Sequence, residues 1–461
     1  MGFAEIATNR FGQGAKPGEL LNAQISPKKW LAEQLQPLIF SPAMEESKHG
    51  FQLLLAHQKA KKQERAQRQA GDSMAQGESS NTSMVPLLQS KKQAYQTINK
   101  FSSKLILNTL TRAIDTDNSF QARLLDFFSN HFSVSNMNLY LRALAPTMER
   151  EAIGPNLIGN FSDLLIAVES HPAMLLYLNN DRSIGADSKL GKKRKKRGLN
   201  ENLAREILEL HTLGVNGGYQ QQDVRELALA ITGWSVGNVA KDEPSGFLFK
   251  AAEHQPGERT ILSKTYPNTG VEQGENILKS LAIHRSTAEH ICSKLARHFI
   301  ADQPDPILVE DMIKSWLGSA GHLKTVLSTM IEHPLSWLPE QQKFKTPRDF
   351  IISTFRACGP KKKLYNRLPG SLMALGQTPF GAGSPAGYGD LSSDWDGAEA
   401  LMLRIEWAEQ LSARIAKTPL EIAQNVLGSY LSDNTSMLLK NAESRQVGLA
   451  MMLLSPEFLR R

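Results

Sequence analysis

The sequence predicts a mostly α-helical protein, a multi-helix orthogonal bundle with at most a small β-hairpin around residues 246–266. Apolar residues recur at helical spacing through most of the 461 residues, and few stretches alternate with the two-residue period of a strand. The chain has 41% hydrophobic residues but only two cysteines, so we expect neither a disulfide framework nor a multi-cysteine zinc site within it. Packing of apolar helix faces must therefore supply the stability.

Composition divides the chain into three predicted regions. Residues 1–60 are expected to form an N-terminal helical segment that packs on the main body, with a helix opened by Pro27. Residues 61–84 are polar and almost free of bulky apolar groups, which is typical of a flexible linker. Residues 85–461 are expected to form the main helical domain.

Helical patterns follow one another along the main domain. In the stretch up to residue 180 the positions predicted to be buried are Phe101, Leu105, Leu124, Phe128, Leu164 and Leu175. Two helices follow a Gly- and Lys-rich loop: Asn200 caps the first and Gly214 ends it, while Asp223 with Glu226 opens the second. Further helices are predicted within 273–300, 307–333, 347–358, 401–415 and 436–453.

Two segments break the helical pattern. The sequences GFLFK (246–250) and RTILSKTY (259–266) have the composition of strands, and we expect them to pair as the small β-hairpin. Residues 376–395 are rich in Gly and Pro and include Phe380 and Trp395. A long ordered loop with aromatic side chains usually covers a functional site, so we expect this loop to lie over one.

The charge is close to balanced apart from one basic run. Lys and Arg total 53 against 46 Asp and Glu, and residues 192–197 are six consecutive basic residues. Runs of this kind bind RNA, acidic partners or anionic lipid surfaces, although most are solvated loops. Aromatic side chains that would stack on bases are scarce nearby, so we do not expect a nucleic acid partner.

The N-terminal sequence and the hydropathy of the chain indicate where in the cell the protein is expected. The N-terminus lacks the apolar run of a secretory signal, and no stretch approaches the roughly 20 apolar residues that a membrane-spanning helix needs. We therefore expect a cytoplasmic protein with no transmembrane segment.

The densest group of polar residues lies on the first helix after the basic run. Asn202, Glu206 and Glu209 share one helix face, so the two carboxylates can supply a general base or two oxygen ligands to one site. The alternative is a solvated face with an Arg205–Glu209 ion pair. His211 lies about 160° around the helix from Glu209, so an uninterrupted helix would keep the two apart.

Histidines elsewhere are further candidates. His131 follows Asn130 on an apolar face, so it is either a buried structural histidine or a ligand or proton carrier opposite the glutamates. His254 lies in a polar loop, where a side chain is freer to take part in function.

A third pattern aligns His290, Lys294 and His298 at four-residue spacing. The lysine between the two histidines would repel a cation, so we interpret this pattern as a solvated helix face. The sequence has no G-x-S-x-G nucleophile elbow, no phosphate-binding loop and no Cys–His signature, which removes the usual support for familiar hydrolases and nucleotide-binding enzymes.

Six segments, in this order along the chain, resemble a known family. They are SNHF (Ser129–Phe132), ESHPAMLLYLNNDRSIG (Glu169–Gly185), GLNENLAREILELHTLGVNGGY (Gly198–Tyr219), ITGW (Ile231–Trp234), KLARHFIAD (Lys294–Asp302) and LGQTPFGAGSPAGYGD (Leu375–Asp390). They are similar to successive signatures of the bacterial domain-of-unknown-function family eighteen hundred, and the similarity runs from end to end. The resemblance implies no agreed activity. It implies frequent gene pairing with a second family, similar to alkaline phosphatases and sulfatases, whose members often carry a twin-arginine export signal.

Three hypotheses about function follow, and the sequence leaves open whether the protein is an enzyme. The first is an enzyme with a carboxylate and histidine pocket, in which Glu206, Glu209, His131 and His211 are catalytic and a divalent metal is a candidate cofactor. Its candidate binding residues are Asn130, Asn202, Arg205, Trp234, His254, Phe380, Tyr388 and Trp395. The second is a non-catalytic partner of the phosphatase- or sulfatase-like protein, carried with it to the periplasm. The third is an RNA-associated protein that uses the basic loop.

Overall fold

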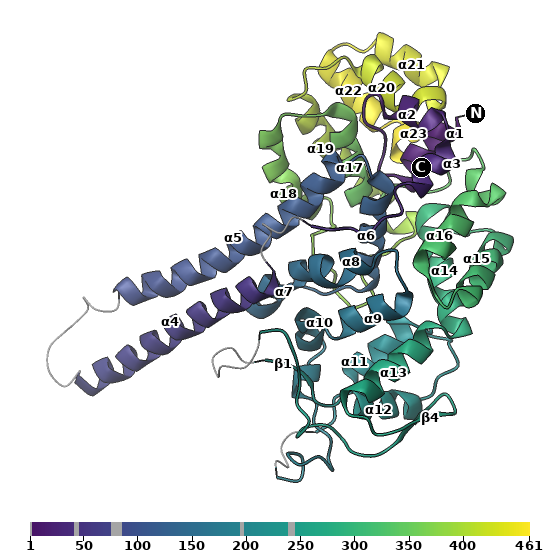
Figure 1. The fold of residues 1–461 in the computed structure, drawn as a ribbon. Helices are drawn as coiled ribbons and strands as arrows, with labels where there is room; N and C mark the ends of the chain where they lie inside the picture. Colours follow the sequence, from purple (N-terminus) through teal and green to yellow (C-terminus); the bar gives the residue numbers. More distant parts are fainter. Residues whose placement is uncertain (1, 41–45, 75–84, 194–197, 238–244) are drawn as a thin grey trace.

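The structure is a computed structural model that describes residues 2–40, 46–74, 85–193, 198–237 and 245–461. The mostly α-helical class is confirmed, since within these residues the strands are limited to four short segments of three residues each. Figure 1 shows a body of short helices that cross at varied angles and one long helical hairpin that projects from it. Among the described helices, none has both the length and the apolar character needed to cross a bilayer.

The first part of the chain contains the projecting hairpin, formed by α4 and α5. Its elements are α1 (Phe3–Glu5), the π-helix η1 (Ile6–Phe11), α2 (Glu19–Gln24), α3 (Pro27–Ala32), α4 (Ser47–Met74), α5 (Val85–Asp115), α6 (Ser119–His131), α7 (Leu139–Met148), the π-helix η2 (Glu149–Ile153), α8 (Gly154–Asn156), α9 (Phe161–Glu169), α10 (Pro172–Tyr177) and the 3₁₀-helix η3 (Asn180–Arg182). Helices α4 and α5 pack against each other, and α7 contacts both of them.

The middle of the chain contains the strands. Its elements are α11 (Asn202–Glu206), the π-helix η4 (Ile207–His211), α12 (Gln221–Ala230), β1 (Trp234–Val236), β2 (Phe247–Phe249), β3 (Arg259–Ile261), β4 (Lys264–Tyr266), α13 (Val271–Ala282), α14 (Arg285–Phe299), α15 (Pro306–Gly318), α16 (Leu323–Glu332) and the 3₁₀-helix η6 (Pro334–Trp337).

The C-terminal part forms a compact group of short helices that also contacts the N-terminal segment (Figure 1). Its elements are α17 (Pro347–Cys358), the 3₁₀-helix η7 (Lys362–Arg367), α18 (Leu368–Ala374), the 3₁₀-helix η8 (Ser392–Asp394), α19 (Ala398–Ser412), α20 (Pro419–Leu427), the 3₁₀-helix η9 (Gly428–Tyr430), α21 (Asp433–Lys440), α22 (Arg445–Leu453) and α23 (Pro456–Leu459).

The strands pair differently from the expected hairpin. Strands β3 and β4 form a hairpin with each other, but β2 pairs antiparallel with β1, so that Trp234 lies opposite Phe249. The Trp234 ring is buried and meets the Phe247 ring edge-on, with centroids 5.5 Å apart. Aromatic cross-strand contacts of this kind stabilise a strand pair, which explains why β2 takes β1 as its partner.

Helix ends also differ in detail from the sequence-based expectation. The helix after the basic run begins at Asn202 instead of directly after Asn200, whose side-chain oxygen accepts a 2.9 Å bond from the Asn202 N–H. It changes into the π-helix η4 and ends at His211, before Gly214. In α12 the N-cap residue is Gln220, and Asp223 closes a capping box from the third helical position.

Two predicted segments fall partly outside the described residues. Helix α4 continues through residues 61–74, which composition alone assigned to a linker, and residues 75–84 lie outside the described part. Ala, Gln, Lys and Arg are strong helix formers, so a polar sequence of this composition is compatible with a helix that packs on a neighbour. Residues 194–197 of the basic run also lie outside the described part.

Apolar side chains form two clusters. The larger one joins the N-terminal segment to the helices from α6 to α16, and the smaller one joins the helices from α17 to α23 with the C-terminal end of α5. All six positions predicted to be buried are buried, with no more than 4% of their surface exposed. Helical spacing therefore identified the core of the first half of the main domain correctly.

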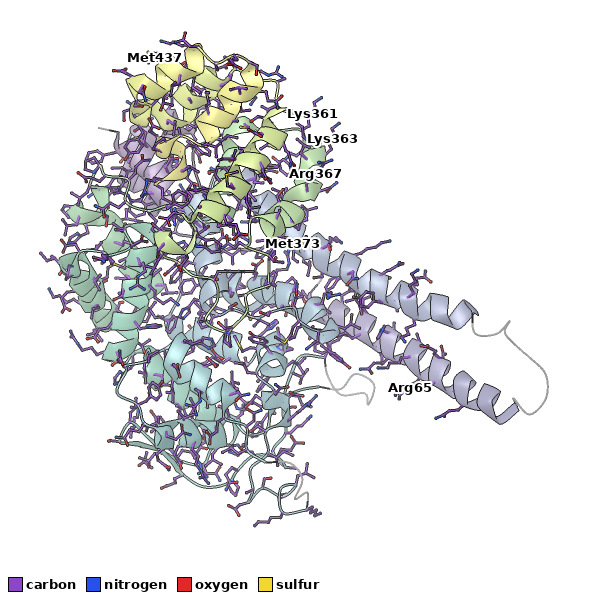
Figure 2. The ribbon with its side chains drawn as sticks, turned by 180° about the vertical axis from the view of Figure 1, so that it is seen from behind. Arg65, Lys361, Lys363, Arg367, Met373 and Met437 are labelled. Atoms are coloured by element: carbon purple, nitrogen blue, oxygen red, sulfur yellow. The ribbon has the colours of Figure 1, made fainter. Side chains whose placement is uncertain are left out.

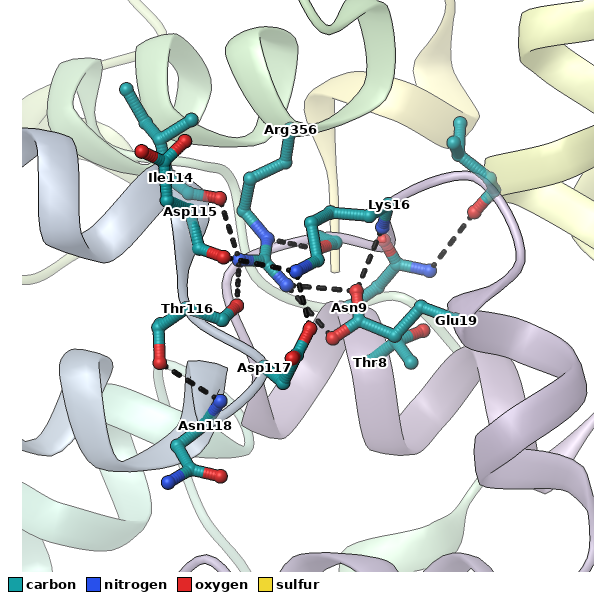
Figure 3. Close-up of polar contacts among 12 residues, drawn as sticks. Thr8, Asn9, Lys16, Glu19, Ile114, Asp115, Thr116, Asp117, Asn118 and Arg356 are labelled. Carbon is teal, nitrogen blue, oxygen red and sulfur yellow. Dashed lines mark hydrogen bonds and ion pairs between the residues drawn. The ribbon is translucent and has the colours of Figure 1, made fainter.

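A buried arginine ties three parts of the chain together. Arg356 of α17 forms two hydrogen bonds of 2.7 and 2.8 Å to the carboxylate of Glu19 at the start of α2. Its other N–H groups donate to the carbonyl oxygens of Gly14, Ala113, Ile114 and Thr116. Figure 3 shows the contacts of Arg356 with Glu19, Ile114 and Thr116, together with the nearby Lys16–Asp117 ion pair, whose Nζ and Oδ1 atoms are 2.5 Å apart. The guanidinium thus fixes the N-terminal segment against the end of α5.

Candidate functional site

A pocket of about 620 Å³ lies between α14, the turn that follows η4, and residues 386–390 of the Gly- and Pro-rich loop. Helix α14 contributes His290, Lys294 and Arg297 to its wall. Two glycine-containing turns form the opposite walls, so backbone approaches the pocket closely there. We call it the Lys294 pocket.

Lys294 makes an unusual contact inside this pocket. Its Nζ lies 3.2 Å from Nδ1 of His131, the last residue of α6. The other ring nitrogen, Nε2, lies 3.2 Å from the backbone carbonyl oxygen of His211. A carbonyl can only accept, so His131 carries its proton on Nε2, and its bare Nδ1 accepts a hydrogen bond from Lys294.

A buried acid–imidazole pair lies behind His131. Nδ1 of His211 is 2.7 Å from Oε1 of Glu169, the last residue of α9, and both side chains are 0% exposed. The rings of His131 and His211 are 6.1 Å apart, centroid to centroid. The pair therefore anchors the end of η4, whose carbonyl group holds His131 in place.

Burial controls the protonation of the groups around Lys294. Burial lowers the pKa of His131 well below its usual value, and the positive charge of Lys294 adds to this effect. Burial, followed by the same lysine, lowers the pKa of His290 to about 4. Burial also lowers the pKa of Lys294, while the Asp390 carboxylate acts in the opposite direction. Both histidines are thus neutral at physiological pH, and Lys294 lies between uncharged imidazoles.

The π-helix η4 explains the position of His211. A π-turn holds an extra residue, and such turns occur frequently at functional sites. In η4 the side chains of Ile207, Leu208 and His211 are buried, whereas Glu209 is only half-buried. The break from α-helical geometry lets the last residue of η4 point into the core beside Glu169.

An asparagine holds the aromatic loop over the site. The Asn130 side chain donates to the Tyr388 carbonyl oxygen at 2.9 Å and accepts from the Tyr388 N–H at 2.8 Å. Gly387 has a φ of 81°, and a Cβ atom there would lie 2.4 Å from the Asn130 carbonyl oxygen. The loop therefore needs glycine at this position to reach the end of α6.

The structure brings some of the sequence-predicted catalytic residues together. His131 and His211 lie side by side, and burial raises the pKa of Glu206, which is half-buried within electrostatic reach of His211. Glu209 instead accepts a 3.3 Å hydrogen bond from Tyr219. Arg205 pairs with Glu201, at 3.5 Å, and not with Glu209 as the solvated-face alternative expected, because it is directed toward the start of the helix.

The predicted binding residues do not all lie in one place. Asn130, Tyr388 and Trp395 belong to the loop contact, since the Trp395 indole donates to the Gly389 carbonyl oxygen at 3.0 Å. Phe380 lines a smaller cavity of about 80 Å³ on the other side of Tyr388. The remaining four lie elsewhere: Arg205 pairs with Glu201, Asn202 is exposed, Trp234 is buried beside β2, and His254 bonds to the Thr232 carbonyl oxygen.

Sequence reasoning missed Glu169 and Lys294 as site residues. It also interpreted His290, Lys294 and His298 as a solvated face, which is wrong because α14 packs against the ends of α6 and η4. His298 accepts a 3.3 Å hydrogen bond from the buried Arg123. Their position in the sequence could have identified them, because Glu169 and Lys294 are the first residues of two of the six segments that resemble the family.

Within the described residues, no group of three or more His, Cys, Asp or Glu side chains is placed to hold a metal ion. Comparison with known proteins gives one match. A family model described as "Protein of unknown function (DUF1800)" matches residues 6–460. No curated protein and no solved structure matches the chain.

Proposed function

The chain belongs to the DUF1800 family, whose description assigns no activity, and we propose that this member is an enzyme whose reaction takes place in the Lys294 pocket. The proposed chemistry is acid–base catalysis on a small polar molecule, with Lys294 as the group that exchanges a proton with the substrate. The proposal keeps the sequence-based hypothesis of a polar pocket, but it assigns the proton transfer to Lys294 instead of to Glu206 and Glu209.

One observation carries this proposal. Lys294 is half-buried, its Nζ bonds to a neutral imidazole, and no carboxylate oxygen among the described residues lies within 4.0 Å of it. Buried lysines are normally paired with an acid, because an unpaired charge in a sheltered site is costly. An amine beside a cavity with no acid in direct contact is typical of a lysine used as a general base or nucleophile.

The neighbouring residues have supporting roles in the proposal. His131 orients the amine and is itself oriented by the carbonyl group of His211, which the Glu169 contact anchors. This arrangement of reactive group, hydrogen-bonded partner and third orienting group is common to many catalytic sites. The pocket volume of about 620 Å³ falls within the range of small-molecule sites.

The proposed substrate contacts follow from the pocket wall. Arg297 lies in the last turn of α14 and lines the pocket with Lys294, so it is placed to bind a negatively charged group of the substrate. Glu206 is proposed as a flanking group, since burial raises its pKa and the nearby His211 acts in the opposite direction. Glu209 and the exposed Asn202 are given no role in this reaction.

The test compares turnover of small molecules by matched variants. Purified wild type, Lys294→Ala and the surface control Lys361→Ala are each incubated with a cell extract freed of macromolecules, and metabolites are followed by mass spectrometry. We expect wild type and Lys361→Ala to change the same compounds and Lys294→Ala to change none of them. An identical change with Lys294→Ala would contradict the proposal, as would the absence of any change with wild type.

A second candidate function is the non-catalytic partner, and exposed apolar side chains favour it. On the C-terminal helices these side chains are Met402, Met437, Leu438, Val447 and Met451. Figure 2 shows Met437 at the outer end of this group. Helices α19 and α21, which carry three of them, both pack on α22, and apolar groups exposed close together are typical of protein contacts. Under this proposal the chain binds a phosphatase- or sulfatase-like protein and is carried out of the cytoplasm with it.

Fractionation of cells tests the partner function. The chain is located in cells with and without the gene for the phosphatase- or sulfatase-like neighbour. Movement from the cytoplasm to the periplasm only when the neighbour is present would support carried export. A chain that stays in the cytoplasm in both strains would contradict it.

A further inference from the structure

The α4–α5 hairpin is the most prominent feature that the pocket does not explain. Its helices have 28 and 31 residues, which corresponds to roughly 40 Å at 1.5 Å per residue. Figure 1 shows the hairpin extending away from the body, with α7 at its base. A projection of this length adds little to the core and presents a large surface to solvent.

The hairpin carries the positive charge of the protein. Residues 47–115 contain eleven Lys and Arg against four Asp and Glu, a surplus equal to the formal net charge of +7 for the whole chain. Among the side chains described between Ser47 and Lys104, Glu64 is the only acidic one, and it is buried with Lys91 3.0 Å away. The exposed cations of this region include Lys59, Lys61, Lys62, Arg65, Lys92 and Lys100. The exposed charges of the side chains described between Ser47 and Lys104 are therefore all positive.

A pocket lies at the base of the hairpin, next to the face of α4 that carries Lys61 and Arg65. It has a volume of about 340 Å³. Leu54 and Gln58 of α4 line it, and Lys61 and Arg65 continue the same helix face at positions i+7 and i+11 from Leu54. Figure 2 shows Arg65 projecting from the hairpin. A basic stripe on α4 therefore leads into the pocket.

The other residues of this pocket can recognise a base. Tyr140 of α7 is 40% exposed, and its hydroxyl oxygen accepts a 2.5 Å hydrogen bond from Gln58. Four further polar residues line the pocket, namely Asn138, Asn179, Asp181 and Arg182, and the Arg182 guanidinium lies 4.0 Å from the Asp181 carboxylate. An aromatic face stacks on any base, while amide side chains hydrogen-bond the edges of an unpaired base.

We propose that the α4–α5 hairpin and the pocket at its base bind single-stranded nucleic acid. Cations of α4 contact the phosphates, and Tyr140 stacks on one base of the strand. This inference goes beyond the proposed enzymatic function and does not depend on it. It also revises the expectation of no nucleic acid partner, which weighed only residues 192–197, because in the sequence the hairpin lysines are spread over two distant segments.

The hairpin surface favours nucleic acid over a lipid surface. A helix that lies on a membrane needs an apolar face to insert among the lipids. Between residues 46 and 115 the large apolar side chain exposed among the described residues is Tyr95, and it packs against Arg142, 5.7 Å from ring centroid to guanidinium. The face that is offered is polar and cationic.

The first test measures salt-dependent binding to a labelled oligonucleotide. The probe is fluorescein-labelled oligouridylate of about 16 nucleotides, the upper site size for such surfaces, followed by fluorescence anisotropy. The test variant is Lys61→Gln, Lys62→Gln, Arg65→Gln. The control variant is Lys361→Gln, Lys363→Gln, Arg367→Gln, which removes equal charge from exposed residues near the C-terminal helices. These residues lie beside the body end of α5 and not on the projecting part of the hairpin (Figure 2).

The expected result is a change in both affinity and salt slope. Each lost phosphate contact lowers the slope of log K against log salt by about 0.7, so the test variant should lose about 2 in slope and at least about tenfold in affinity. The control variant should match wild type. Equal losses in both variants, or no binding by wild type at roughly 100 μM, would overturn the proposal.

The second test separates base recognition from charge. Tyr140→Leu should lower affinity by roughly tenfold with an unchanged salt slope, because stacking carries no charge. Wild-type affinity in this variant would overturn the assignment of the pocket. Vesicles of phosphatidylserine and phosphatidylcholine serve as the competing surface. Binding to these vesicles without binding to the oligonucleotide would assign the hairpin to membranes instead.

Discussion

Removal of His211 should leave a buried carboxylate without a partner. Glu169 and His211 are both 0% exposed and 2.7 Å apart, so water cannot replace either side chain. His211→Phe keeps an aromatic ring in the cavity but strands the Glu169 carboxylate. Breaking a buried pair in this way costs about 3–5 kcal/mol, and the complete burial places this case at the upper end.

The double variant provides the sharper measurement. In Glu169→Leu/His211→Phe the charge is removed together with its partner, so the free energy of unfolding should recover to within about 1–2 kcal/mol of wild type. Urea unfolding followed by circular dichroism measures all three variants, with the half-buried His57→Phe on the projecting hairpin as the control. The reasoning is refuted if the loss in the double variant equals the sum of the two single losses.

Three further predictions follow from buried polar groups. Arg356→Met should lower the free energy of unfolding by about 3–5 kcal/mol because it strands Glu19, whereas the exposed Arg367→Met should have almost no effect in the same urea unfolding experiment. Burial lowers the pKa of Lys345 to about 7, so the folded state holds this proton less tightly than the unfolded state. The stability of wild type relative to Lys345→Met should therefore increase by roughly 3.5 kcal/mol as the pH rises from about 7 to 10, and a flat difference would contradict this. Asn130→Ala removes two hydrogen bonds to Tyr388, so amide hydrogen exchange of residues 386–390 should accelerate, while unchanged exchange would show that the loop is held by other contacts.

The fold was predictable from the sequence to the extent that helical periodicity decided it. The buried positions from Phe101 to Leu175 follow a 3.6-residue period, and the period alone identifies them. The pairing of β2 with β1 was not predictable, because it depends on where the Trp234 ring is buried after the chain folds. Packing between α4 and α5 likewise turned a polar sequence into helix where composition predicted a linker.

The site was predictable only in part. His131 and His211 were identified as candidates because polar residues concentrate around them in the sequence. Glu169 and Lys294 were missed, since they lie on helices that are separate in the chain and meet the histidines only through tertiary contacts. The π-helix η4 could not be predicted from a periodicity of 3.6 residues per turn. It determines the direction of the His211 side chain.

The proton affinity of Lys294 tests the central claim most directly. Competitive acylation with acetic anhydride at a series of pH values, read by peptide mass spectrometry, gives the pH at which each lysine becomes reactive. Because burial lowers its pKa, Lys294 should become reactive at a lower pH than the exposed lysines of the chain. A Lys294 that reacts only at the same or a higher pH than those lysines would show that its charge is stabilised, and the acid–base role would fail.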